Sequence, residues 1–322
     1  MLAMSYSIAH IALPVPLDRS FDYLIKPGQA PVIGGRVKVP FGRQRLIGVV
    51  VKLSNESEFS REKLKGIDAV LDNASLWPPH LYKLLNWGST YYQYPLGETL
   101  ANAMPAWLRK GREASFAALK AWQITELGKN QDLNKLTRAP KQAKALNLVR
   151  HQSCSHEQML EEEITAATLK AVVDKGWIEE ISLAPKPSYW QRNVEVTQEK
   201  PQLNEEQAIA IATVNASPEF GCYLLDGVTG SGKTEVYLQL LEPILKAGRQ
   251  ALVLVPEIGL TPQTINRFKR RFNVPVDVIH SGLNDTERLN SWLAARDNHA
   301  GIIIGTRSAL FTPFHDLGIL TV

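Results

Sequence analysis

The octapeptide GVTGSGKT, Gly227 to Thr234, constrains the fold of this chain more than any other stretch. It fits the pattern Gly-x-x-x-x-Gly-Lys-Ser/Thr and lies between the apolar segment CYLLD and the amphipathic segment TEVYLQLLEPIL. A loop of this kind, a P-loop, connects a buried strand to a helix. We therefore predict a strand at GCYLLDG (221–227), then the loop, then a helix from about Lys233 to Ala247.

The chain beyond about residue 200 alternates apolar runs with helical patterns and short turns. Further strands are expected at QALVLVP (250–256), VDVIH (276–280), GIIIGT (301–306) and GILTV (318–322). Thr261 and Pro262 fit the start of one connecting helix, and Gly248 fits the end of another. Strands joined by crossover helices form parallel sheets, so residues 199–322 are predicted to be a partial α/β lobe.

The first 110 residues are predicted to form a small β-rich domain. Extended segments rich in β-branched and aromatic residues include HIALPVPLDRSFDYLI and RVKVPFGRQRLIGVVVKL. The second segment indicates a hairpin with arms at Arg36–Phe41 and Arg45–Leu53. From Pro78 the apolar residues fall three and four apart, which predicts a helix over this β module.

Residues 111–198 show the pattern of a winged helix and a linker. Three short helices are expected, and Thr165 can cap the last of them, which Gly176 ends before the strand WIEEISL. Winged helices often bind DNA, but Lys170 and Lys175 are the only basic residues of this candidate recognition helix. This domain could contact DNA bases through that helix, or it could serve as a packing or spacer domain, and the sequence leaves both alternatives open. The segment APKPSYW (184–190) fits a linker.

Composition limits the class of protein without deciding its function. A chain of 322 residues with 44% hydrophobic and 21% charged residues suits two or three folded domains. The net charge of +4 is compatible with a nucleic-acid partner but is too small to indicate one. No apolar run approaches the ~18–20 residues that a membrane-spanning helix needs, and no signal peptide is evident, so we expect a cytoplasmic protein with no membrane partner. Cys154 and Cys222 form no metal or disulfide pattern and are expected to be buried thiols.

The P-loop carries the clearest chemistry. Its glycines let successive N–H groups point inward at a helix N-terminus, where the helix dipole also favours phosphate. Lys233 would reach the β- and γ-phosphates, and Thr234 would offer its hydroxyl to Mg²⁺. The candidate nucleotide-binding residues are Gly227, Val228, Thr229, Gly230, Ser231, Gly232, Lys233 and Thr234, with Lys233 and Thr234 as candidate catalytic residues. The alternative, a glycine-rich turn with a solvated lysine, fits the flanking segments poorly.

Several segments together resemble the superfamily 2 helicases, and most closely the primosomal replication protein N′ (PriA) family. They are LNEEQAIAI, LLDGVTGSGKTEVY, LVPEIGLTPQT, IHSGLND and IIIGTRSALFTPF. At the N-terminus, HIALPVPLDRSFDYL and RVKVPFG resemble that family's 3′-DNA-end-binding domain. The resemblance implies a multidomain α+β and α/β protein: an end-binding domain, a winged helix and a partial RecA-like lobe.

In the motor segment, the resemblance implies contacts to nucleotide and to single-stranded DNA. Gln207 would contact the nucleotide base, although a solvent-facing helix position is its alternative. The residues implied to line the single-strand path are Pro256, Glu257, Thr261, Gln263, Gly305, Thr306 and Arg307. Hydroxyls and helix N-termini can bind phosphate oxygens without reading sequence. Thr261 can also be a simple N-cap, and the two roles are compatible.

In the N-terminal domain, the resemblance implies a pocket for a 3′-terminal nucleotide. Its residues are Phe21, Asp22, Tyr23, Gly42 and Lys65. A carboxylate can accept hydrogen bonds from a base or sugar hydroxyl, an aromatic ring can stack, and a lysine can balance phosphate. From the residues alone, Phe21 and Tyr23 are better interpreted as core residues and Asp22 as a solvated edge charge.

The final run GILTV is the strand that, in this family, leads into Asp-Glu-Glu-His. Those carboxylates bind Mg²⁺ and polarise water, so their absence predicts a chain truncated before the second acidic motif and unable to turn over ATP by itself. The zinc-binding cluster and the second lobe of the family are absent as well, so zinc is expected only in the missing part.

Two functions remain open at this point. The first is the N-terminal portion of an ATP-dependent 3′-to-5′ DNA helicase that restarts replication at stalled forks. The second is a truncated module that binds forks or 3′ ends and does not hydrolyse ATP. A small-molecule P-loop kinase is a poor third, because no lid-like arginine cluster follows. The resemblance implies ATP and Mg²⁺ as cofactors. It implies forked and single-stranded DNA, single-stranded DNA-binding protein and primosome proteins as partners.

Overall fold

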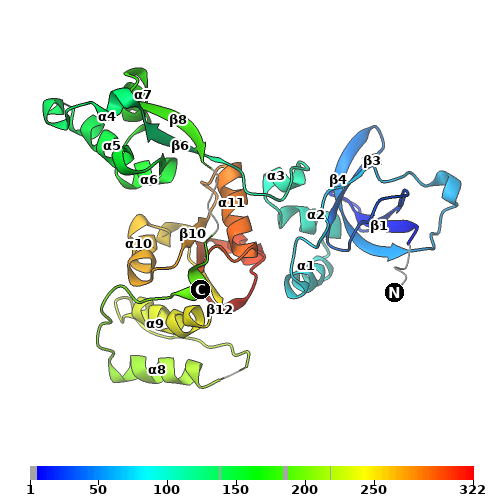
Figure 1. Ribbon diagram of the computed structural model, residues 1–322. Helices are drawn as coiled ribbons and strands as arrows, with labels where there is room; N and C mark the ends of the chain where they lie inside the picture. The colour runs from blue at the N-terminus through cyan, green and yellow to red at the C-terminus, as the bar shows by residue number, and fades with distance from the viewer. Residues whose placement is uncertain (1–5, 138, 184–187, 218) are drawn as a thin grey trace. The chain divides into compact units, whose positions relative to one another are not determined.

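The structure is a computed structural model that describes residues 6–137, 139–183, 188–217 and 219–322. The chain separates into two compact units. One consists of Met1–Ser115 with Pro187–Val322, and the other of Phe116–Lys186 (Figure 1). None of the helices among the described residues combines the length and apolar composition needed to cross a bilayer.

The N-terminal part of the first unit contains a five-stranded antiparallel sheet in the order β2-β1-β4-β3-β5. The strands are β1 (Ile8–Ala12), β2 (Phe21–Leu24), β3 (Arg36–Phe41), β4 (Gln44–Ser54) and β5 (Ala69–Val70); a 3₁₀ turn, η1 (Arg61–Lys63), precedes β5. The predicted hairpin is confirmed as β3 and β4, with Phe41 paired to Gln44 across a turn of two residues. Gly42 occupies that turn with a left-handed φ of 58°.

Three short helices follow this sheet: α1 (Pro79–Tyr91), α2 (Leu96–Asn102) and α3 (Ala106–Arg109). The predicted helix after Pro78 is therefore confirmed as α1. Helix α2 approaches the sheet so closely that a Cβ on Gly97 would lie 1.7 Å from the carbonyl oxygen of Leu13. Only glycine fits at this position.

The second unit is built on the sheet β7-β6-β8. Its strands are β6 (Leu119–Ile124), β7 (Cys154–Ser155) and β8 (Ile178–Leu183), and its helices are α4 (Glu126–Lys129), η2 (Leu133–Leu136), α5 (Pro140–His151), α6 (His156–Glu161) and α7 (Ala166–Asp174). Thr165 caps α7 by accepting a hydrogen bond from Thr168 N–H, as expected. Strand β6 was not predicted, although Trp122 from it packs into the core of this unit.

The linker expected at 184–190 is only partly described, because residues 184–187 lie outside the described residues. Its end belongs to the first unit. Trp190, in the 3₁₀ turn η3 (Trp190–Arg192), is buried in the core of the α/β lobe, and its Nε1–H donates to the Asn298 carbonyl at 3.1 Å.

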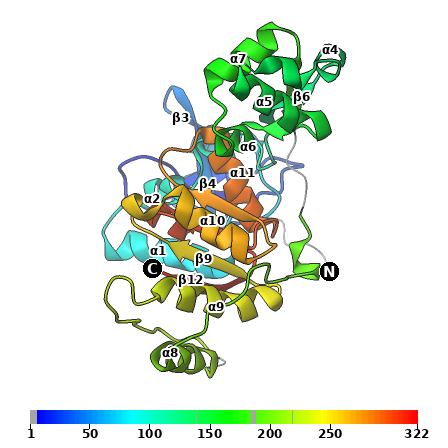
Figure 2. The same ribbon diagram turned by 90° about the vertical axis from the view of Figure 1, so that its left-hand side faces the viewer.

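The α/β lobe has a parallel sheet in the order β10-β11-β9-β12. Its elements are α8 (Glu205–Asn215), α9 (Lys233–Lys246), β9 (Gln250–Leu254), η4 (Glu257–Gly259), α10 (Pro262–Arg271), β10 (Val276–Ile279), α11 (Asp285–Arg296), β11 (Ile302–Gly305), η5 (Arg307–Phe311) and β12 (Leu317–Thr321). Figure 2 shows α9 running along β9 and β12, with α8 beyond it. Leu241 and Leu245 of α9 pack with Val253 and Ile302 in the lobe core. The expected parallel sheet is thus confirmed for four strands.

The prediction of one more strand, at GCYLLDG (221–227), is wrong in this structure. Residues 219–228 form no strand and pair with none of the described strands, and Leu224 is 93% exposed. An apolar run becomes a buried strand only where a neighbour accepts its backbone hydrogen bonds and covers its side chains. Cys222 lies in this segment and is exposed, so the expectation of a buried thiol holds for Cys154 alone.

Candidate nucleotide site and DNA interface

The P-loop lies at the N-terminus of α9, as the sequence predicts. Gly232 is the N-cap of this helix, and both Gly230 and Gly232 have a left-handed φ of 84°. Such φ values strain any residue with a Cβ, so the loop depends on glycine at both positions. The first turn of α9 leaves N–H groups without helical acceptors, which suits an anionic ligand.

Lys233 closes the loop on itself. Its ammonium group donates to the carbonyl oxygens of Gly227 and Val228, at 2.5 and 3.0 Å. A phosphate that enters the loop would compete with two neutral carbonyls for this cation. Because hydrogen bonds between two charged groups are the stronger kind, the exchange favours phosphate.

Gln207 lies against the P-loop and does not face solvent alone. It forms a capping box with Asn204 at the start of α8, at 2.8 and 3.1 Å. Its Nε2 also donates to the Ser231 carbonyl at 2.9 Å. The structure therefore brings Gln207 to the loop as the sequence suggested, while its contact to a nucleotide base remains a prediction.

A cavity of about 660 Å³ opens beside the loop. It is lined by residues 229–235, by Gln198, Glu199 and Pro201, and by Leu238, Arg267 and Arg271. Two arginines of α10 thus face the cavity that holds Lys233 and Thr234, which the sequence interpretation missed. The available signal was the basic run at the end of RFKRRF, which is also typical of any helix C-terminus.

Arg271 is a buried cation, only 3% exposed, and connects three segments of the lobe. It pairs with the carboxylate of Glu235, in the first turn of α9. It also donates to the Glu199 carbonyl at 3.1 Å, in the segment that leads to α8. The end of α10 is thereby connected to the first turn of α9 and to the segment that leads to α8.

The residues expected along the single-strand path gather at one edge of the parallel sheet. Gly305 at the end of β11 is in register with Leu254 at the end of β9, and its carbonyl accepts from Val255 N–H at 2.9 Å. Pro256 and Glu257 follow β9, Thr261 and Gln263 begin α10, and Thr306 and Arg307 follow β11. Thr261 caps α10 by accepting from Thr264 N–H at 3.2 Å. Arg307 is exposed and Thr306 is buried.

The residues expected at the DNA end surround strand β2, at one edge of the N-terminal sheet. Phe21 meets Phe41 edge to face with ring centroids 5.2 Å apart, and Phe41 directly precedes Gly42. The carbonyl of Lys65 accepts from Leu24 N–H at 2.9 Å. The structure therefore collects Phe21, Gly42 and Lys65 around the same strand.

Tyr23 fits the core interpretation. Its ring is buried in the hydrophobic cluster of this sheet, and its hydroxyl donates to the Pro40 carbonyl at 3.0 Å. Burial, assisted by the charge of Asp68, raises the pKa of Tyr23. A neutral, buried ring is not available for stacking on a base.

Asp22 is not the solvated edge charge that the residues alone suggested. Its side chain is 10% exposed, with one carboxylate oxygen 2.7 Å from Nδ1 of His10. The other oxygen accepts from the Ser57 hydroxyl at 2.6 Å. The sequence interpretation missed both partners. His10 begins the extended segment HIALPVPL, but nothing local to the sequence places Ser57 near Asp22.

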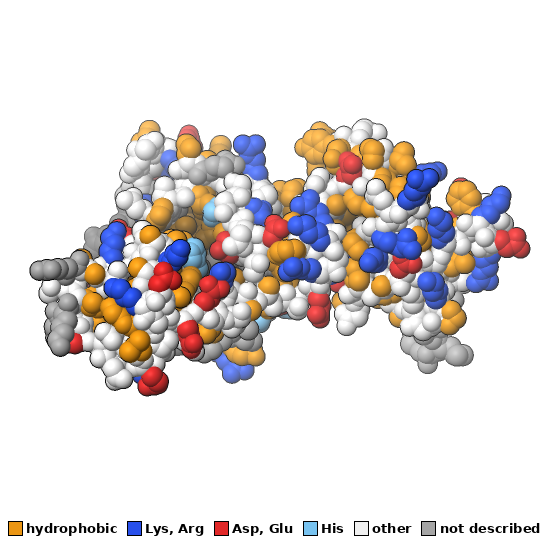
Figure 3. All heavy atoms as spheres, turned by 90° about the horizontal axis from the view of Figure 1, so that it is seen from above, with side chains coloured by type: hydrophobic (Ala, Val, Ile, Leu, Met, Phe, Trp, Pro, Cys, Tyr) orange, Lys and Arg blue, Asp and Glu red, His pale blue; other side chains and the backbone are white. Residues whose placement is uncertain are grey.

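Positive charge is concentrated around this sheet. Residues 1–115 contain 14 Lys and Arg against 9 Asp and Glu, a net of +5 that exceeds the +4 of the whole chain. Lys and Arg side chains are spread over this part of the surface, on the right in Figure 3. Such a surface attracts the phosphate backbone without reading sequence.

Comparison with known families gives a match for each part of the chain. Residues 10–105 match the 3′ DNA-binding domain (3′BD) of PriA, and residues 118–180 match the winged helix of primosomal protein N′-like proteins. Residues 204–320 match the DEAD/DEAH box helicase family. Replication restart protein PriA of Haemophilus influenzae is 44% identical over 97% of this chain. Over nearly its whole length, the chain is thus similar to PriA proteins.

Other PriA proteins align over nearly the whole chain as well. Those of Chlamydia trachomatis and Bacillus subtilis are 33% and 29% identical over 98% and 95% of it. The chain spans less than half the length of these relatives, since the match covers 43% of the Haemophilus and Chlamydia proteins and 47% of the Bacillus protein. The PriA matches confirm the expected order of β-rich end-binding domain, winged helix and partial RecA-like lobe, and the helicase match implies use of a nucleotide.

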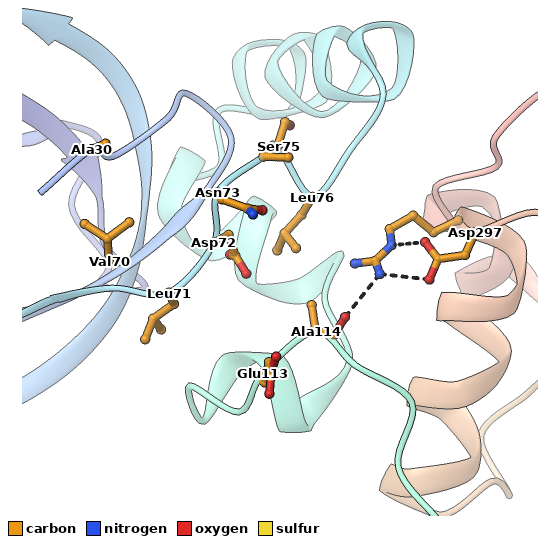
Figure 4. Close-up of a pocket in the computed structure, with 12 residues that line it drawn as sticks. Ala30, Val70, Leu71, Asp72, Asn73, Ser75, Leu76, Glu113, Ala114 and Asp297 are labelled. Atoms are coloured by element: carbon orange, nitrogen blue, oxygen red, sulfur yellow. Dashed lines mark hydrogen bonds and ion pairs between the residues drawn. The ribbon is translucent and has the colours of Figure 1, made fainter. Parts of the chain in front are cut away.

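A second cavity in the first unit does not suit the DNA or nucleotide ligands of a PriA protein. It measures about 640 Å³ and is lined by residues that include Asp72, Glu113 and Asp297 (Figure 4). The arginine among them, Arg296, is held by Asp297 at 2.6 and 3.0 Å and by the Ala114 carbonyl at 3.1 Å. With its arginine already paired, this cavity offers no free cation among its lining residues to a phosphate, unlike the cavity beside the P-loop.

Proposed function

We propose that this chain is the DNA-sensing and nucleotide-binding portion of an ATP-dependent 3′-to-5′ DNA helicase. It would recognise stalled or forked DNA and restart replication through primosome assembly. The observation that carries the proposal is one unit that contains both a P-loop cavity and a basic sheet domain whose edge strand holds Asp22. The proposed domain boundaries are 1–110, 111–198 and 199–322.

The 3′-terminal nucleotide of a DNA strand would bind along β2. Asp22 would accept hydrogen bonds from the base or sugar, and Phe21 would support the base. Gly42 would allow close backbone approach, and Lys65 would balance phosphate. Tyr23 would contribute through its backbone, because its ring is buried.

The single strand would pass the carboxyl ends of β9 and β11. Exposed Thr261 and Gln263 at the start of α10 and exposed Arg307 after β11 offer donors to phosphate oxygens. Pro256, Glu257, Gly305 and Thr306 would shape the same edge. Contacts of this type carry no sequence information, which suits a motor that travels over any DNA.

ATP would be held by Gly227–Thr234, with its phosphates on the loop N–H groups and on Lys233. The residues present fit such a ligand, because Gly230 and Gly232 have left-handed conformations, Lys233 supplies an ammonium group and Thr234 supplies a hydroxyl. Thr234 would contact the Mg²⁺ that accompanies the nucleotide, and Gln207 would reach the base. The metal supplies charge neutralisation between the β- and γ-phosphates when bound.

A binding module without ATP turnover is the second candidate for the isolated 322 residues. It is favoured by the unpaired segment 219–228 in front of the P-loop and by Lys233, which donates to the loop's own carbonyls. We propose this behaviour for the isolated polypeptide and helicase activity for the PriA protein as a whole.

Phosphate release separates the two candidates. We expect the 322-residue chain to bind a fluorescent ATP analogue with Mg²⁺, and Lys233→Ala to abolish this binding, because the loop then lacks its only lysine. Exposed Lys83→Ala on α1, far from the P-loop in the sequence, is the control. DNA-stimulated phosphate release that Lys233→Ala abolishes would establish turnover by the chain itself, whereas release at background level would leave the binding module.

The remaining assignments rest on the family. We propose single-stranded DNA-binding protein and other primosome proteins as partners, and the cytoplasm as the location. Zinc is expected only in the parts of PriA proteins that lie outside these 322 residues.

A further inference from the structure

His10, Asp22 and Ser57 form a hydrogen-bonded group on the outer face of the N-terminal sheet. His10 on β1 is directly opposite Asp22 on β2 and Lys52 on β4. The hydrophobic core lies on the other face, where Ala9, Ile11 and Tyr23 point. The group is therefore not part of the apolar core of the domain.

Ser57 reaches Asp22 from the loop that follows β4. That loop is tied to the sheet at its start, where Asn55 Oδ1 accepts from Ser7 N–H at 2.9 Å. The Ser57 hydroxyl also accepts from Phe59 N–H at 3.0 Å while it donates to Asp22. The hydroxyl thus donates one hydrogen bond and accepts another, and the two bonds together fix its position over the carboxylate.

His10 holds the other carboxylate oxygen. Because a carboxylate only accepts, the nearby Nδ1 must carry a proton. Nε2 is buried, and no hydrogen-bond partner is found for it among the described residues. A proton there would be an unsatisfied buried donor, so the geometry favours the neutral Nδ1–H tautomer.

Each oxygen of Asp22 therefore holds one internal hydrogen bond and keeps one acceptor direction. A side chain fixed at both oxygens has a single orientation, and an approaching donor meets acceptors that are already in place. A rotation of the Asp22 side chain would point its free acceptor positions in other directions and so change which ligand groups it can bind.

Resting on the end-binding function proposed above, we propose that His10 and Ser57 are positioning residues for 3′-end recognition. They hold Asp22 in the orientation that selects a terminal nucleotide with a free 3′-hydroxyl. Neither residue needs to touch DNA. Their loss lets the carboxylate turn, so the preference for a hydroxyl end declines before the general attraction to DNA does.

The test compares two forked DNAs that differ only at the 3′ end, one with a hydroxyl and one with a phosphate. Fluorescence anisotropy with the 322-residue chain gives the ratio of their dissociation constants, that of the phosphate-ended fork divided by that of the hydroxyl-ended fork. The variants are His10→Ala, Ser57→Ala and the conservative His10→Asn and Ser57→Thr. Exposed His80→Ala and exposed Ser60→Ala, which are outside this group, are matched controls.

We expect His10→Ala and Ser57→Ala each to reduce the ratio by about fivefold to tenfold, which is within the range for one typical hydrogen bond. His10→Asn and Ser57→Thr keep a donor at the same place and should retain most of the preference. Affinity for the phosphate-ended fork should stay near wild type in all of them, since basic residues dominate that binding.

The outcomes separate the two claims. Equal affinity of the wild-type chain for both forks would remove the end-binding function itself. A wild-type preference that Asp22→Ala abolishes but that survives in His10→Ala and Ser57→Ala would overturn only the positioning role. Circular dichroism checks folding; if His10→Ala unfolds, Ser57→Ala against Ser57→Thr decides the question.

Discussion

Arg36 and Arg271 are the buried arginines among the described residues, and both connect segments that are far apart in the sequence. Arg36 forms a two-pronged ion pair with Asp72, at 2.7 and 2.8 Å, and donates to the carbonyls of Leu108 and Arg112. Arg271 does the equivalent for α9, α10 and the segment before α8. A planar, permanently charged fork suits such multiple contacts better than lysine.

Arg271→Ala is expected to destabilise the α/β lobe. Removal of one partner of a buried ion pair costs about 3–5 kcal/mol because the other charge stays buried, and partial exposure of Glu235 puts this case at the lower end. Arg270→Ala, an exposed neighbour on the same helix, should change stability by about 0.5 kcal/mol or less. Urea denaturation measures both; similar values for the two variants would refute the role of Arg271.

At the scale of elements, α9 is stabilised through Glu242. Burial alone would raise the pKa of this carboxyl, but the hydrogen bonds and charges of Lys200 and Lys246, at 2.6 and 2.8 Å, lower it below its usual 4.5. A lowered folded pKa means that the contribution is complete above the unfolded pKa and is lost as pH falls through the folded value.

Glu242→Gln should therefore weaken the lobe at pH 6 and lose little more as pH falls from about 4.5, whereas the wild-type chain should lose this contribution over that range. The urea midpoint measured from pH 6 to pH 3 tests this, with exposed Glu219→Gln as the control. Parallel curves for wild type and Glu242→Gln would contradict it.

Residues 219–228, which precede the P-loop, are the segment that we expect a protease to cut first. Phe220 and Leu224 are 96% and 93% exposed and lie outside any helix or strand. Trp87, Tyr91 and Tyr92 are exposed as well, but at the end of α1. Because proteases need an extended chain, brief chymotrypsin treatment should cut first within 219–228.

A nucleotide with Mg²⁺ should slow this cut, because a ligand in the P-loop orders the chain that enters it. Lys233→Ala should remove the protection. First cuts near Trp87, or a rate that the nucleotide leaves unchanged, would count against this account of the segment.

At the scale of the whole molecule, local patterns predicted most elements. Four parallel strands, the β3–β4 hairpin, helix α1 and the caps at Thr165 and Thr261 all follow from short-range periodicity and turn chemistry. The P-loop was located because its function requires its residues to be adjacent in the chain.

Features that depend on distant partners were missed. Strand β6 pairs with β8 nearly sixty residues later, and GCYLLDG has the pattern of a strand but no paired neighbour among the described residues. The Ser57–Asp22 bond and the Arg271–Glu235 pair each span about thirty-five residues. A single sequence carries no signal for such pairs, since each partner by itself looks like an ordinary polar residue.

Charge is distributed unequally along the chain. The net charge is +5 in residues 1–115, whereas residues 187–322 carry 12 Lys and Arg against 14 Asp and Glu. On the function proposed above, general attraction to DNA would come from the sheet that holds Asp22, and the lobe would add defined phosphate contacts at the P-loop and the strand ends.

The most direct test of end sensing uses two forks with the same sequence and charge. In one, the nascent strand has its 3′ end at the branch point; in the other, it has its 5′ end there. Fluorescence anisotropy with the 322-residue chain at fixed salt should show about tenfold tighter binding to the first fork, a difference of about 1.4 kcal/mol. Equal affinity for the two forks would contradict 3′-end recognition by this chain.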